Sequence, residues 1–87
     1  MENRLDGNVA AGVLEQVFPF EMTTVEATCA GCGQVNVVGA LVVYKHGMGT
    51  IVRCPSCEWV LIRVTQIKGC CWLDMRGVRV LQIPVEP

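Results

Sequence analysis

The spacing of apolar residues changes along the chain from a helical period to a strand period. In residues 8–18 apolar side chains recur about every 3.6 residues, Asp6 or Asn8 can cap the first turn, and Pro19 ends the pattern. This segment is therefore predicted to form one short amphipathic helix that packs on a sheet of its own chain or of a second copy. The apolar face of this helix comprises Val9, Ala10, Val13, Leu14, Val17 and Phe18.

From Thr23 onward apolar and polar residues alternate in the two-residue period of β-strands, and Gly-containing turns separate the runs. The order of strands and short turns is typical of an antiparallel meander. We therefore predict a mostly β fold with one N-terminal helix. The predicted strands are 23–29, 37–45, 50–53, 59–67, 71–75 and 78–83.

Length limits how stable such a fold can be. A chain of 87 residues is one domain, 1–87, with the helix at 8–18 and a β region at 23–87. A domain of this size hides only about 60% of the surface that its unfolded chain exposes. Disulfides, a metal or a partner subunit usually stabilise such small domains, and the six cysteines offer the first two.

Four of the cysteines are spaced as two matched pairs. The segments CAGCG and CPSCE each hold a Cys-x-x-Cys turn, and 21 residues, 33–53, separate the pairs. Two intervening residues let both sulfurs of a pair point at one ion, and a hairpin between the pairs folds one pair over the other. The spacing predicts a zinc-ribbon-like sheet around one structural Zn²⁺ without an open coordination position. The predicted ligands are Cys29, Cys32, Cys54 and Cys57.

Two other interpretations of these pairs are open. The first is disulfide bonding, which Gly33 and Pro55 at turn positions disfavour in a reducing compartment. The second is iron, because the two pairs also resemble the knuckles of rubredoxin, and such a site would serve electron transfer. Rubredoxins lack a long β-meander after the second knuckle, whereas this chain continues for 30 residues beyond Cys57. Zinc is therefore the preferred metal.

The N-terminal segment carries neither a secretion nor a membrane signal. It has one basic residue in its first 20, Arg4, and Glu15 and Gln16 interrupt its apolar run. We therefore expect a cytoplasmic protein without membrane association, where thiols stay reduced.

The chain as a whole resembles an uncharacterised family of short bacterial zinc-ribbon proteins of unknown function. The likeness rests on an opening LDGN, MTT before the first cysteine pair, CxxCG, VRCPxC and a closing RG step. It implies a zinc-ribbon fold with the four ligands named above, and it indicates nothing about activity. Glu58 departs from the zinc-ribbon pattern, in which glycine often follows the second knuckle. This departure concerns the backbone shape of the knuckle and not the four ligands.

Charge is distributed unevenly although the net charge is only −1. Residues 1–44 sum to −4 and residues 45–79 to +4, but the six cations of the second segment are scattered singly along strands. Such spacing is typical of a solvated surface and does not announce a phosphate-binding track. We therefore expect a protein partner or a second copy, met through the apolar sheet surface of residues 59–83. Nucleic-acid binding through Lys45, Arg53, Arg63, Arg76 and Arg79 is the disfavoured alternative.

The sequence indicates no enzyme, no catalytic residue and no binding residue for an organic cofactor. His46 is expected in a solvated hairpin turn, and Cys70 and Cys71 have no activating partner in the sequence. Trp59 and Trp72 are expected in the core or half-buried in a sheet, since base stacking would require them exposed among cations.

Overall fold

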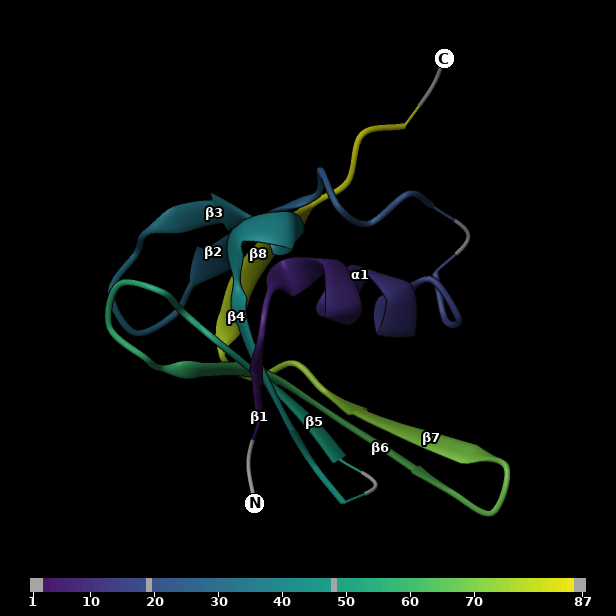
Figure 1. Cartoon of the computed structure of the whole chain (residues 1–87). Coiled ribbons are helices and arrows are strands. Elements are labelled where there is room, and N and C mark those ends of the chain that lie inside the picture. Colours follow the sequence, from purple (N-terminus) through teal and green to yellow (C-terminus); the bar gives the residue numbers. More distant parts are fainter. Residues whose placement is uncertain (1–2, 19, 48, 86–87) are drawn as a thin grey trace.

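The alternating segments form two antiparallel sheets beside one helix in the computed structural model, which describes residues 3–18, 20–47 and 49–85 (Figure 1). This confirms the mostly β, zinc-ribbon-like fold. In chain order the elements are β1 (Asn3–Leu5), α1 (Gly7–Leu14), β2 (Glu26–Cys29), β3 (Val35–Val37), the 3₁₀ turn η1 (Val38–Ala40), β4 (Val42–His46), β5 (Gly49–Arg53), β6 (Val60–Ile67), β7 (Cys70–Asp74) and β8 (Val78–Gln82).

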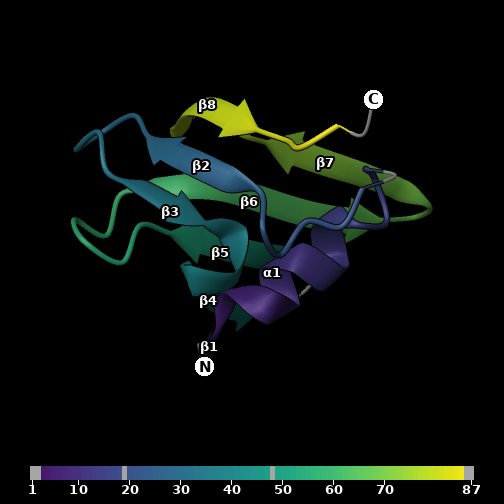
Figure 2. The ribbon, with the colours of Figure 1, turned by 90° about the horizontal axis from the view of Figure 1, so that it is seen from above.

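The larger sheet has five strands in the order β1-β4-β5-β6-β7. Burial alternates along its central strand β5, where Thr50 and Val52 are buried and Ile51 is half-buried. Alternate side chains of a strand point to opposite faces, so this sheet has a covered inner face and an open outer face. Figures 1 and 2 show α1 and the other sheet together on the inner side.

The smaller sheet has the order β3-β2-β8, so the last strand does not extend the meander as expected. After β7 the chain turns at residues 75–77 and crosses to pair with β2. The strand predicted at 37–45 is also interrupted, because the Val38 and Gly39 N–H groups donate to the carbonyls of Val25 and Thr23 and hold a 3₁₀ turn there. These bonds carry the chain from the small sheet to the large one.

The helix begins close to the predicted position but ends earlier. Its start is capped by Asp6, whose Oδ1 accepts from the Asn8 N–H at 3.0 Å. It ends at Leu14 instead of continuing to 18, and two turn hydrogen bonds, from the N–H groups of Val17 and Phe18 to the Leu14 carbonyl, follow it. Pro19, the expected stop, lies outside the described residues.

This early end changes the buried face of the helix. Ala10, Ala11 and Leu14 are buried, and Val9, Val13 and Phe18 pack at the margin of the core. Val17 was expected on this face and is 45% exposed, because it follows the last helical turn. The core that these residues share with the inner faces of both sheets includes Met22, Val25, Val38, Leu41, Val43, Val52, Leu61, Ile62 and Val64.

None of the helices in the described residues is long and apolar enough to cross a membrane.

Candidate metal centre

The two cysteine pairs lie on two knuckles with the same backbone hydrogen bonds. In the first, the Gly33 N–H donates to the Cys29 carbonyl and the Cys29 N–H donates to the Gln34 carbonyl, both at 2.9 Å. The second repeats these contacts 25 positions later, from Glu58 to Cys54 and from Cys54 to Trp59, again at 2.9 Å. The two knuckles thus form the same backbone turn.

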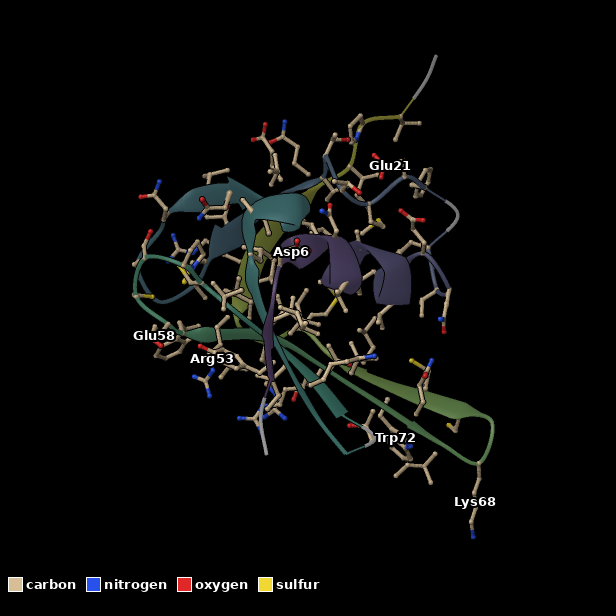
Figure 3. All side chains as sticks on the ribbon, in the orientation of Figure 1. Asp6, Glu21, Arg53, Glu58, Lys68 and Trp72 are labelled. Carbon is tan, nitrogen blue, oxygen red and sulfur yellow. The ribbon has the colours of Figure 1, made fainter. Side chains whose placement is uncertain are left out.

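The residue that follows the second cysteine of each pair has a left-handed backbone. Gly33 has φ 78°, and Glu58, at the equivalent position, has φ 63°. The departure from glycine at Glu58 therefore leaves the shape of the knuckle unchanged, although a side chain with a Cβ is strained in this region. Arg53 lies beside it (Figure 3), and its Nη1 donates to the Glu58 carbonyl at 3.1 Å.

The knuckles bring together the four cysteines that the sequence singles out. All four Sγ atoms lie within 4.8 Å of one another, and the Cys29–Cys57 and Cys32–Cys54 pairs are each separated by 3.7 Å. Four sulfurs at about 2.3 Å from a tetrahedral zinc ion are about 3.8 Å apart. The cluster therefore has the size of a tetrahedral metal site, and its four sulfurs could hold one ion.

Hydrogen bonds inside each knuckle favour ionised sulfurs. The Gly31 N–H donates to Cys29 Sγ at 3.3 Å, and the Ser56 N–H donates to Cys54 Sγ at 3.4 Å. Burial opposes ionisation of Cys54, but N–H groups of Cys57 and Ser56 outweigh it and lower the pKa of this thiol to about 7. The turn therefore prepares one sulfur of the second pair for metal binding.

The sulfurs of Cys57 and Cys32 resist ionisation while no cation balances them. The Trp59 N–H favours the Cys57 thiolate, but loss of solvent contact and the three neighbouring sulfurs outweigh it and raise the pKa to about 12. The pKa of Cys32 is raised as well: a hydrogen bond from Gln34 opposes the rise, and loss of solvent contact and the sulfurs of Cys54 and Cys29 outweigh it. A divalent cation at the centre would offset this repulsion and allow all four thiols to bind as thiolates.

The cluster joins the two sheets. Cys29 is the last residue of β2 in the small sheet and Cys54 directly follows β5 in the large one, and both are buried. Cys32 and Cys57 are exposed at the rim. An ion held by all four sulfurs would therefore tie one sheet to the other at the edge of the core.

A contact that the sequence analysis missed runs beside the cluster. The Ala30 N–H donates to the Gly77 carbonyl at 2.8 Å, and the Gly77 N–H donates to the Leu61 carbonyl at 3.2 Å. A Cβ on Gly77 would lie 1.9 Å from the Val60 carbonyl oxygen, so only glycine fits between the first knuckle and β6. The closing RG step was the only sequence signal for this position.

The other candidate residues are not part of the four-sulfur cluster. Cys70 and Cys71 are both exposed in β7. His46 ends β4, and its side chain lies outside the described residues. The expectation of core tryptophans is wrong: Trp59 is 52% exposed and Trp72 is 63% exposed.

Comparison with known proteins adds one match. The family model described as a family of unknown function (DUF6510) matches residues 1–86. No curated protein and no solved structure matches the chain.

Proposed function

This chain belongs to the DUF6510 family of unknown function, and we propose that it is a non-enzymatic binding module fastened by one zinc ion. The observation that carries the proposal is the arrangement of the four sulfurs, whose 3.7 Å separations across the knuckles match a tetrahedral ion. The proposed ligands are Cys29, Cys32, Cys54 and Cys57.

The donor set supports a structural role for the ion. Four thiolates complete a tetrahedral shell and leave no position for a substrate or an activated water. Thiolate ligands select zinc, copper(I) or iron among biological metals, and zinc alone among these has no redox chemistry. In this position zinc would hold the end of β2 against the end of β5. The small core alone provides little stability for this joint.

The fold supports binding rather than catalysis. Its large sheet is covered on one face only, and the outer face leaves aromatic and charged side chains in solvent. A module that uses a metal to build a sheet and then offers the open face to a partner needs no reactive group. We propose that this outer face is the binding surface.

Elemental analysis of the protein purified under reducing conditions tests the proposal directly. We expect one zinc per chain and no visible absorption. A strong chelator should unfold the chain, since structural zinc sites contribute about 10–16 kcal/mol of binding free energy and a small domain has about 5–15 kcal/mol of stability in total.

Cysteine substitutions supply the control. Cys29→Ser or Cys54→Ser should abolish stoichiometric zinc and lower the unfolding temperature, whereas Cys70→Ser or Cys71→Ser, at exposed positions in β7, should change neither. Stoichiometric iron with a visible band would replace the proposal with an electron-transfer site. A metal-free protein that stays folded, or zinc lost through Cys70→Ser, would overturn it.

A further inference from the structure

Strand register gathers on one face the cations that are scattered in the sequence. Ile51 of β5 pairs with Arg63 of β6, and Arg53 follows Ile51 by two residues, so both arginines lie on the outer face of the five-stranded sheet. Their separation along the chain had spoken against a basic surface. Figure 3 labels these positions: Asp6 and Glu21 lie on the side of the sheet opposite to Arg53 and Trp72.

Aromatic rings lie among these arginines. Tyr44 pairs with Ile51, and the Arg53 guanidinium lies over its ring at 5.7 Å from the centroid. Trp72 pairs with Thr65, two residues beyond Arg63 on β6, so its exposed indole is also on the outer face. We define the outer face by Tyr44, Ile51, Arg53, Arg63, Thr65, Trp72 and Asp74.

A groove of about 480 Å³ opens at the end of this face nearest the cysteine cluster. The exposed ring of Trp59 lines it together with Arg63, Asp74 and Arg76. Asp74 lies between the two arginines: Arg76 Nη2 donates to its Oδ2 at 2.8 Å, and this bond, together with the charge of Arg63, lowers the pKa of the carboxyl. The Arg76 side chain is 91% exposed, so it retains donors for a ligand.

We propose that the outer face and this groove bind single-stranded nucleic acid, with bases stacked on Trp59 and Trp72 and phosphates held by the arginines between them. The inference rests on the proposed binding function and names its partner. Val60, next to Trp59, is five residues from Thr65, the partner of Trp72, which is about 17 Å along β6. That span suits a site of about four nucleotides, the lower end of the range for OB-folds that bind single strands.

The charges disfavour a second copy of the chain as the occupant. A symmetric pair of outer faces would enclose Arg53 and Arg63 of both chains, while each defined face contributes one carboxylate, Asp74. Burying this excess of positive charge costs free energy. The groove holds two arginines and a single carboxylate among the described residues that line it. A polyanion complements this surface, and exposed rings beside arginines are the arrangement on which bases of any sequence stack.

Fluorescence anisotropy of the full-length, zinc-loaded protein with a labelled 12-nucleotide dT strand tests the inference. Arg63→Gln and Trp72→Ala should each weaken binding about tenfold. Arg79→Gln on β8 and Phe20→Ala, exposed residues outside the outer face, should change it less than twofold. The slope of log K against log salt should be about −2 for three phosphate contacts. The matching duplex should bind less tightly than the single strand.

Several results would overturn the assignment. The first is that folded, zinc-loaded protein does not bind the strand. The second is that Arg79→Gln loses as much affinity as Arg63→Gln. The third is that a hexaglutamate peptide binds as tightly as the strand and its affinity is unchanged by Trp72→Ala, which would indicate an acidic protein partner. Trp59→Leu is a second variant for the groove. Leucine is chosen because the Trp59 ring also packs on Gly31, and a large apolar side chain keeps part of this contact. Zinc content measured on the same samples tests the proposed function separately, since none of the four proposed ligands takes part in the pairing of β4 to β7 that forms the outer face.

Discussion

Glycine in place of Glu58 is expected to make the zinc-loaded protein more stable. With φ 63°, Glu58 has the left-handed backbone that its counterpart Gly33 adopts without strain. A residue with a Cβ costs about 1–2 kcal/mol in this region, and the extra freedom of glycine in the unfolded chain offsets about 0.5–1 kcal/mol. The net gain should be about 0.5–1 kcal/mol, which raises the unfolding temperature of a domain this size by about 2–8 °C.

The structure indicates that nothing else is lost in this substitution. The hydrogen bond from Arg53 goes to the backbone carbonyl of Glu58, which glycine retains. Glu58→Ala is the matched control, because it removes the same carboxylate but keeps the Cβ. Gly33→Ala is the reverse experiment: nothing lies within 4 Å of the added Cβ, so any loss comes from the backbone alone.

Thermal unfolding followed by circular dichroism, at one fixed excess of zinc, measures all three variants on the same scale. The expected order of stability is Glu58→Gly, then the natural chain and Glu58→Ala close together, then Gly33→Ala. If Glu58→Gly were no more stable than Glu58→Ala, the strain at this knuckle would not exist and the reasoning would be refuted.

Two further predictions concern the joint between the sheets and the protons of the cluster. Gly77→Ala should cost about 3 kcal/mol in chemical denaturation, because its Cβ would meet the Val60 carbonyl oxygen at 1.9 Å. Gly12→Ala, whose added Cβ meets nothing within 4 Å outside the helix's own backbone, should instead stabilise by up to about 1 kcal/mol. Equal effects of the two substitutions would contradict this account. Zinc binding at pH 7 should release at least about two protons, from Cys32 and Cys57, whose pKa values are raised in the metal-free cluster. Because the metal displaces these protons, zinc affinity should rise with pH and fall as pH falls. Titration calorimetry in buffers of different ionisation enthalpy measures the number of protons released. A release near zero would contradict this prediction.

Local signals in the sequence were sufficient for most of the strands, the start of the helix and the cysteine cluster, but not for β1 or for η1. A Cys-x-x-Cys turn is closed by bonds between residues at most five apart, such as Cys29 to Gln34, so its shape follows from a short segment. The helix start followed in the same way from Asp6, which bonds to Asn8. The end of the helix did not, because the burial of Ala11 in place of Val17 depends on the sheets beneath it.

The antiparallel order of β4 to β7 was predicted, but the strand register and the place of β8 were beyond the sequence, and the surface chemistry depends on the register. The bulge between β5 and β6 shifts the register after Val52, and β8 leaves the meander for the small sheet. Each of these is fixed by contacts between distant segments. The sequence therefore does not show that Arg53, Arg63 and Trp72 lie on one face.

The cysteine cluster and the groove share structural parts, so a metal bound at the four sulfurs would also act on the proposed binding site. The Trp59 N–H favours the Cys57 thiolate, while the Trp59 ring lies against Gly31 of the other knuckle and lines the groove. Gly77, at the other wall of the groove, is bonded to Ala30 of the first knuckle and to Leu61 of β6. An ion that fixes both knuckles therefore also fixes the two walls of the groove. Preorganised walls lower the free energy cost of ordering side chains on binding. The zinc would thus contribute to affinity without contacting the ligand.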